Sequence, residues 1–320
     1  MNSRTVLYGT RRRIVATIVC ALPGLAANVR AQTSTSHLRI GVVIPSRALT
    51  ADERSTIAGI RLGAAEARQT ARLFGTDVQV FEANGNGKTH SAHSAASFLS
   101  SGRQVQILIA VSGAATDTVA KFAEEHRTIF LNVGSRSDAL RSACRQYTFH
   151  VEGSATMYAN AARLFASRQG AAMRAARATD SIVLWHQRLE RFGASQLNDR
   201  YRGVSRSGMD GAAWAGWVAM KTVAEAALRT KSDNAAQLLA YLESPTTQLD
   251  GHKGWPLSFR AADHQLRQPL YIVVASPGTG ARVVDFPDLR ALNSGFAGSD
   301  ANDVLDRLSA GSNTRCQWKQ

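Results

Sequence analysis

The chain has 320 residues, of which 44% are hydrophobic, and its 38 basic and 24 acidic residues give a formal charge of +14. This length is enough for one large domain or two lobes with real cores. Nucleic-acid-binding proteins cluster Lys and Arg on one face, often with interleaved aromatic residues, whereas the arginines here are dispersed. We therefore expect no nucleic-acid partner, and we interpret the charge as a basic surface that attracts anionic ligands or membrane surfaces.

Residues 1–31 have the pattern of an export signal peptide. Three arginines at residues 11–13 precede an apolar stretch over residues 14–27, and Val29-Arg30-Ala31 places small residues where a signal peptidase reads them. The apolar stretch is too short to span a bilayer comfortably, and no later segment is apolar enough, so we expect no membrane-spanning helix. TRRRIV also half-matches a twin-arginine signal, which leaves that route as the alternative to general export. Cleavage after Ala31 removes five arginines and no acid, so the formal charge falls to +9.

Two of the three cysteines, Cys144 and Cys316, lie beyond this signal. In an oxidising compartment an even number of cysteines favours a disulfide, with two free thiols as the alternative. Such a bridge would tie the C-terminal region to the loop before Tyr147.

The first half of the mature chain alternates between short apolar runs and helical patterns. The predicted strands cover residues 38–44, 77–82, 105–111 and 128–133, and the predicted helices cover residues 51–73, 89–100 and 114–126. Strands separated by such helices pair in parallel through right-handed crossovers, and VQILIAV lacks the polar alternation of a half-exposed strand. We therefore predict an α/β fold class, with a doubly wound parallel-sheet lobe over residues 32–152.

The pattern changes after Phe149. We predict a reduced, mostly helical second lobe over residues 153–210, returning helices and strands over 211–275, and a loop-rich C-terminal tail over 276–320. The elements expected in these regions are helices at 155–167, 211–229 and 234–242 and strands at 181–185, 257–259 and 270–275. Residues 168–181 are the candidate linker. Trp214 and Trp217 fall on one helix face, which favours core packing over a ligand site.

The stretch ANGNGKTH at residues 83–90 has the strand-loop-helix context of a phosphate-binding loop but lacks its residues. Such a loop needs a glycine five positions before Gly87, where Glu82 stands, and no acid that could hold Mg²⁺ ends a neighbouring strand. We therefore interpret the stretch as a polar turn. His90 and His93 are spaced to reach one metal ion, but no third ligand is evident, so we expect neither a metal site nor a cofactor.

The sequence contains no GxSxG, HExxH or CxxC motif. We therefore expect no enzymatic activity, and a hydrolase is the third hypothesis.

Two strand-to-helix turns carry the functional signal. Ser112-Gly113-Ala114 follows one predicted strand, and Gly134-Ser135-Arg136 follows the next. The carboxyl ends of parallel strands form a crevice that collects ligands, and helix N-termini there offer free N–H groups to an anion. Small residues let a ligand approach the backbone, and Arg136 can pair with a ligand carboxylate. Ordinary helix capping by Ser or Thr is the alternative for each turn.

Several segments resemble the type I periplasmic solute-binding proteins, in the branched-chain amino-acid branch of ABC importers. They are IGVVIPSRALTADERSTIAGIRLGAAEA, LIAVSGAATDTVAKFAEEHRTIFLNVGSRSDALR and MDGAAWAGWVAMKTVAEAALR. WHQRLERFGASQLNDRYR and HKGWPLSFRAADHQLRQPLY are similar to binding proteins that accompany PQQ-dependent alcohol dehydrogenases. The resemblance implies a two-lobed periplasmic clamp that closes on a small polar molecule and presents it to a membrane permease. It also implies that residues 112–114 and 134–136 grip the carboxylate and amino groups of that ligand.

The second lobe departs from the family pattern. Only 17 residues separate Ser167 from Trp185, whereas one βαβ unit needs about 30. We therefore expect a shortened second lobe and an open, shallow pocket. The first hypothesis is an exported binding component of an ABC transporter for a small polar or carboxylate-bearing solute, linked to a quinoprotein dehydrogenase. The alternative is a degenerate scaffold that docks on a transporter or dehydrogenase, and saturable binding of a small molecule would separate the two.

Overall fold

The computed structural model describes residues 36–85, 89–168, 181–276, 280–285, 301–309 and 315–318. The predicted signal peptide, Gly87 and Lys88 of the polar turn, and residues 169–180 of the candidate linker lie outside the described residues.

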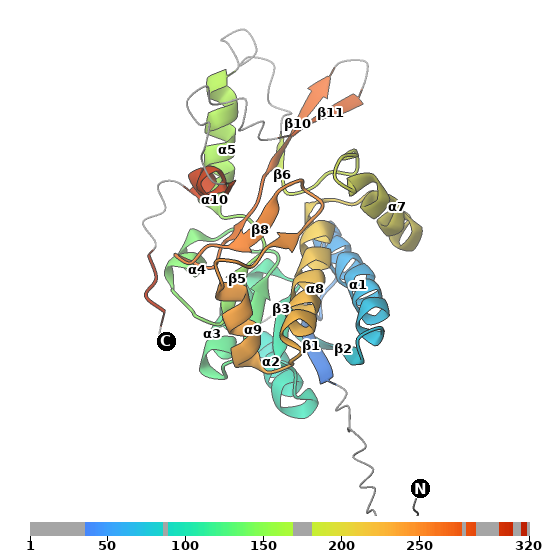
Figure 1. Cartoon of the computed structure of the whole chain (residues 1–320), viewed down its shortest axis with the longest axis vertical. Helices are drawn as coiled ribbons and strands as arrows, with labels where there is room; N and C mark the ends of the chain where they lie inside the picture. Colours follow the sequence, from blue (N-terminus) through green and yellow to red (C-terminus); the bar gives the residue numbers. More distant parts are fainter. Residues whose placement is uncertain are drawn as a thin grey trace, which may run out of the picture. The chain divides into compact units, whose positions relative to one another are not determined.

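A parallel sheet of five strands organises the first half of the chain (Figure 1). Its strands run in the spatial order β2-β1-β3-β4-β5 and comprise β1 (Ser36–Pro45), β2 (Thr76–Gly85), β3 (Ile107–Ala110), β4 (Ile129–Asn132) and β5 (Thr148–His150). β3 and β4 are buried along their whole length, as befits strands that are covered on both faces. The predicted α/β fold class with a doubly wound parallel sheet is confirmed.

Helices cover both faces of this sheet because successive strand residues point to opposite sides. Val42 belongs to a core cluster with residues of α1 (Ala51–Arg72) and α8 (Gly211–Thr230), whereas its neighbour Val43 belongs to a second cluster. That second cluster includes residues of α2 (Thr89–Ser97) and α3 (Thr116–Glu125). α2 continues as a π-helical segment, Phe98–Gly102, and α3 follows a 3₁₀ turn, Gly113–Ala115.

α1 and α8 lie side by side in Figure 1 and pack at very short range. A Cβ atom added to Gly59 would lie 1.9 Å from the carbonyl oxygen of Ala213, and one added to Gly216 would lie 2.4 Å from that of Thr56. Only glycine therefore fits at this crossing. Trp214 and Trp217 on α8 are 0% and 1% exposed, which confirms the predicted core packing.

The remaining described residues form helices and two small antiparallel sheets. In one sheet, β10 (Tyr271–Ser276) pairs with both β6 (Ser181–Val183) and β11 (Gly280–Asp285). The other sheet contains β7 (Leu249–Asp250), β8 (Pro256–Phe259) and β9 (Leu266–Arg267). The helices are α4 (Asp138–Ser142), α5 (Ala155–Arg168), α7 (Ala194–Ser205), α9 (Ala235–Glu243) and α10 (Ala301–Asp306), with a 3₁₀ turn at Arg307–Ser309.

Several of these elements were not predicted. β5, α4 and α7 are absent from the expected set, and residues 276–320, expected to be a loop-rich tail, contain β11 and α10. β11 is stabilised by pairing along its whole length with β10, a partner that its own sequence does not reveal. Within the described residues, no helix combines the length and apolar character that crossing a membrane requires.

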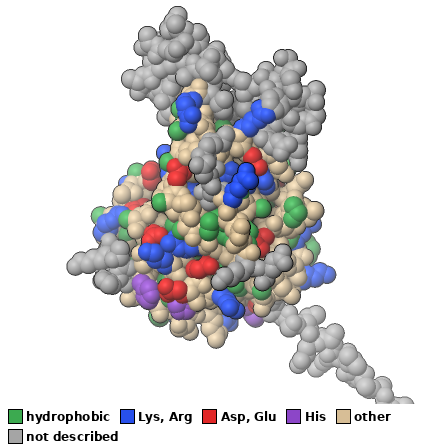
Figure 2. All heavy atoms as spheres, turned by 90° about the vertical axis from the view of Figure 1, so that its left-hand side faces the viewer, with side chains coloured by type: hydrophobic (Ala, Val, Ile, Leu, Met, Phe, Trp, Pro, Cys, Tyr) green, Lys and Arg blue, Asp and Glu red, His purple; other side chains and the backbone are tan. Residues whose placement is uncertain are grey.

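Charged side chains of both signs are interspersed on the face shown in Figure 2. Lys and Arg alternate there with Asp and Glu, and they do not form a single basic stripe. This distribution matches the dispersed arginines of the sequence.

Candidate functional site

The two predicted turns lie next to each other at the carboxyl edge of the parallel sheet. β3 pairs with β4 in parallel, so the loops that follow these strands emerge at the same edge. A Cβ atom added to Gly113 would lie 3.1 Å from the carbonyl oxygen of Gly134. The structure therefore brings Ser112-Gly113-Ala114 and Gly134-Ser135-Arg136 together, and the glycines permit the close approach.

The first turn leads from β3 into the 3₁₀ turn and α3. Ser112 is buried, while Gly113 and Ala114 are exposed. Within the described residues, the hydroxyl of Ser112 makes no capping hydrogen bond; its Oγ lies 3.5 Å from Nη2 of Arg47 instead. Helix capping therefore does not explain the presence of a serine at position 112. The first backbone N–H groups of the following helix have no acceptor within that helix.

The second turn is held from within by Asn132 at the end of β4. Its Oδ1 accepts hydrogen bonds from the backbone N–H groups of Gly134 (3.2 Å) and Ser135 (2.8 Å), and its Nδ2 donates to the carbonyl oxygen of Ser135 (2.8 Å). These two amides are therefore engaged inside the turn. Ser137 caps α4 by accepting a hydrogen bond from Leu140 N, so capping does explain this neighbouring hydroxyl.

Arg136 contacts two residues beyond β5, Tyr158 and Glu152. Its guanidinium carbon lies 3.8 Å from the ring centroid of Tyr158, and its Nε lies 3.6 Å from Oε1 of Glu152. The Glu152 side chain is 8% exposed, against 55% for Arg136. Oε1 of Glu152 also accepts hydrogen bonds from Tyr158 Oη (2.8 Å) and Gly153 N (2.9 Å). Burial raises the pKa of Glu152 above its ordinary value, although Arg136 acts in the opposite direction.

Arg47 is a second arginine at this edge, and no motif in the sequence distinguishes it from the other dispersed arginines. It follows β1 and forms two hydrogen bonds with Glu53, from Nη1 to Oε2 at 2.8 Å and from Nη2 to Oε1 at 2.6 Å. Glu53 also forms a capping box with Thr50 at the start of α1. Burial of Glu53 opposes its ionisation, but hydrogen bonds from Arg47, Thr50 and Ser112 outweigh burial and lower its pKa to about 2.

Arg141 on α4 is a buried residue that hydrogen-bonds to the second turn. Its Nη1 donates to the carbonyl oxygens of Ser135 (2.8 Å) and Ser137 (2.9 Å), and its Nη2 donates to that of Glu152 (2.5 Å). Its Nε donates to Oε1 of Gln265 (2.9 Å). Burial lowers the pKa of Arg141 to about 10, so this side chain stays charged at neutral pH. No pattern in SDALRSA distinguishes it from a surface arginine.

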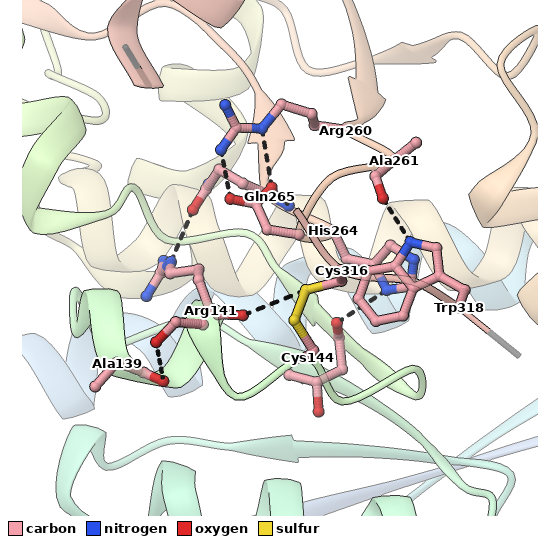
Figure 3. Close-up of a disulfide and its surroundings, with 12 residues drawn as sticks. Ala139, Arg141, Cys144, Arg260, Ala261, His264, Gln265, Cys316 and Trp318 are labelled. Carbon is pink, nitrogen blue, oxygen red and sulfur yellow. Dashed lines mark hydrogen bonds and ion pairs between the residues drawn. A yellow bond between two sulfur atoms is a disulfide. The ribbon is translucent and has the colours of Figure 1, made fainter. Parts of the chain in front are cut away.

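A disulfide between Cys144 and Cys316 lies beside this arginine (Figure 3). Cys316 N donates to the carbonyl oxygen of Ala262 (2.8 Å), and the indole of Trp318 stacks on His264 at a centroid distance of 3.9 Å. The next residue, Gln265, donates through Nε2 to the carbonyl oxygens of His150 and Glu152. The bridge, the 261–265 loop and the second turn therefore form one contiguous structure.

Two other features do not contribute to this site. His93 packs edge-on against Phe122, the side chain of His90 lies outside the described residues, and the described part of the chain holds no group of three metal-ligating side chains. A cavity of about 730 Å³ lies elsewhere, between α1 and α8, and its lining includes Glu66, Phe74, Lys221 and Glu225.

Comparison with known proteins identifies the fold. A family model described as "Periplasmic binding protein" matches residues 37–183, which include both turns and the five parallel strands except the first residue of β1. No curated protein matches the sequence. The architecture is the type I periplasmic-binding-protein α/β fold.

Three solved structures illustrate the similarity. The branched-chain amino acid transporter substrate binding protein LivJ from Streptococcus pneumoniae, in complex with isoleucine, is 14% identical with a TM-score of 0.61, covering 78% of this chain and 100% of its own. An ABC-type branched-chain amino acid transporter from Rhodopseudomonas palustris is 15% identical with a TM-score of 0.65, at 78% and 96% coverage. A solute binding protein of an ABC transporter from R. palustris, in complex with benzoate, is 12% identical with a TM-score of 0.62, at 78% and 96% coverage.

Proposed function

We propose that this protein is the exported binding component of an ABC transporter and that it binds a small carboxylate-bearing solute. The observation that carries the proposal is the juxtaposition of the Ser112–Ala114 and Gly134–Arg136 turns at the carboxyl edge of the parallel sheet. The exposed side chains of Arg136 and Arg47 offer donors there, as does the hydroxyl of the buried Ser112. Structures of the same fold hold isoleucine or benzoate, which are both carboxylates.

The proposal includes the setting in which the protein works. It acts in the periplasm after removal of residues 1–31, delivers its solute to a membrane permease, and has no catalytic step and no cofactor. The resemblance to proteins that accompany PQQ-dependent dehydrogenases suggests a quinoprotein partner. Complete oxidation of primary alcohols yields carboxylic acids, so such a partner would supply ligands of the chemistry that this site offers to bind.

Thermal unfolding of the secreted mature protein tests the proposal. A ligand that binds only the folded state stabilises it by about 2.7 kcal/mol at 100 times its Kd, so benzoate, phenylacetate, leucine and short alcohols are compared over a concentration series. We expect at least one carboxylate to raise the Tm and Arg136→Ala to abolish that increase. Arg72→Ala, at an exposed position on α1, is the control and should keep it. No increase with any compound would instead favour the degenerate scaffold, and the search would turn to protein partners.

A further inference from the structure

We propose that the ligand of this site is a carboxylate without an ammonium group, and not a zwitterionic amino acid. This inference rests on the proposed function and specifies the class of its ligand. An α-ammonium group carries three hydrogen-bond donors and a positive charge. Once it is removed from water by binding, it therefore needs a carboxylate or several free carbonyl oxygens, because an unpaired desolvated charge is strongly unfavourable.

Three carbonyl oxygens near this edge, those of Ser135, Ser137 and Glu152, already accept hydrogen bonds. Arg141 donates to the carbonyl oxygens of Ser135, Ser137 and Glu152. Asn132 donates to Ser135 as well, and Gln265 donates to Glu152. The buried guanidinium group of Arg141 thus already binds the carbonyl oxygens that could otherwise accept from a ligand ammonium group.

The acidic side chains at this edge are engaged as well. Glu53 binds Arg47 through both oxygens and accepts a third hydrogen bond from Thr50 N (2.9 Å). Asp138 binds the backbone and the hydroxyl of Thr156. In the region of the second lobe, Asp199 pairs with Arg202 and Asp210 caps α8.

Glu152 is the acid that lies beside Arg136. Its Oε1 takes the hydrogen bonds from Tyr158 and Gly153 and lies beside Arg136, which leaves Oε2 as the oxygen that an ammonium could reach. The side chain of Arg136 lies beside this carboxylate and is 55% exposed, whereas that of Glu152 is 8% exposed. An ammonium group would meet this like charge first, while a carboxylate would be attracted by it.

The basic side chains at this edge are more exposed than the acidic side chains with which they pair. The side chains of Arg47 and Arg136 are 44% and 55% exposed, while those of their partners Glu53 and Glu152 are each 8% exposed. A ligand that approaches from solvent therefore meets the guanidinium groups first, because the carboxylates are buried. This arrangement suits a carboxylate that carries an apolar or hydroxyl-bearing body.

Matched pairs of compounds test the inference by isothermal titration calorimetry on the mature protein. Each pair shares a skeleton and differs in the ammonium group: leucine with 4-methylpentanoate, and phenylalanine with 3-phenylpropanoate, with benzoate added. We expect the acid to bind at least ten-fold tighter than its amino acid. An amino acid that binds as tightly as its acid, or more tightly, would overturn the inference while leaving the proposed function intact. Failure of every compound to bind would overturn both.

Two variants separate the role of Arg136 from that of its partner Glu152. Arg136→Gln should weaken binding of the acid at least ten-fold. Glu152→Gln should strengthen it about three-fold or more, because the change removes a carboxylate that competes for Arg136. Arg202→Gln is the matched control, since Arg202 is 52% exposed and pairs with Asp199 on α7; it should leave the affinity unchanged. Weaker acid binding in Glu152→Gln, or amino-acid binding that this change abolishes, would contradict the inference.

Discussion

Arg141 is a single buried residue on which the geometry of the candidate site depends. Arg141→Met removes a buried charged donor that makes four hydrogen bonds, although Asn132 still donates to Ser135 O and Gln265 still donates to Glu152 O. We therefore expect the free energy of unfolding to fall by about 3–5 kcal/mol, the range found when one partner of a buried charged network is removed. Urea denaturation at pH 7 measures the loss. The control Arg72→Met, at an exposed position, should stay within about 0.5 kcal/mol, and a similar small loss for Arg141→Met would contradict the expectation.

Glu53 makes stability depend on pH. Its pKa in the folded protein is about 2, below the ordinary value of 4.5, so the unfolded chain binds its proton more readily. The stabilisation is present above about pH 4.5 and is lost as the pH falls toward 2. We expect it to amount to about 1–2 kcal/mol, less than the full lowering implies, because water screens the half-exposed Arg47.

The measurement for Glu53 compares wild type with Glu53→Gln by denaturant unfolding across the acid range. The variant should be less stable near pH 6.5, and the difference should shrink as the pH falls below 4. A difference that stays constant with pH would show that the ion pair with Arg47 does not stabilise the fold.

At the scale of elements, the contact between α1 and α8 tolerates no added side chain. Gly59→Ala would place a methyl group 1.9 Å from the carbonyl oxygen of Ala213, and such overpacking costs about 1–3 kcal/mol or more. Gly203→Ala on α7 is the matched control because a Cβ there has no atom within 4 Å. We expect the control to gain about 0.5–1 kcal/mol from better helix propensity. Thermal unfolding of both variants tests the contrast, and equal Tm values would refute it.

The elements that the sequence predicted are those in which apolar residues recur at the spacing of a strand or a helix. β1, α1 and β3 have apolar residues at the spacing of a buried strand or helix, and the structure contains them within a few residues of the predicted bounds. α7 was missed because it is mostly polar and buries only Ala194, Leu197, Asn198 and Tyr201. β5 has three residues, too few for a periodic pattern. Such elements depend on tertiary partners that local sequence does not specify.

The candidate site was predictable only in part. The order of strands and helices placed residues 112–114 and 134–136 at one edge of a parallel sheet. It could not show that Asn132 engages the amides of Gly134 and Ser135, or that Arg141 and Gln265, 124 residues apart, bind each other below the turn. These contacts form only when the chain folds, and neither the residue types nor their spacing in the sequence predict them.

At the scale of the whole molecule, the disulfide joins residues separated by 172 positions. Closing a loop of that length restricts the unfolded chain, and removing such a bridge typically costs about 2–5 kcal/mol. We expect the double change Cys144→Ser and Cys316→Ser to lower the free energy of unfolding by an amount in the upper half of that range. Dithiothreitol should destabilise the wild type by a similar amount and leave the double variant unaffected. A reductant effect on both proteins would show that it acts elsewhere.

The same bridge bears on how the chain would mature under the proposed export. By the general export route, Cys144 would reach the far side of the membrane well before Cys316, and no other cysteine lies between them. Once the predicted signal peptide is removed, the thiol has a single intramolecular partner. A disulfide oxidase would therefore suffice for correct pairing, and loss of the isomerase that reshuffles mispaired bridges should leave the yield of native protein unchanged.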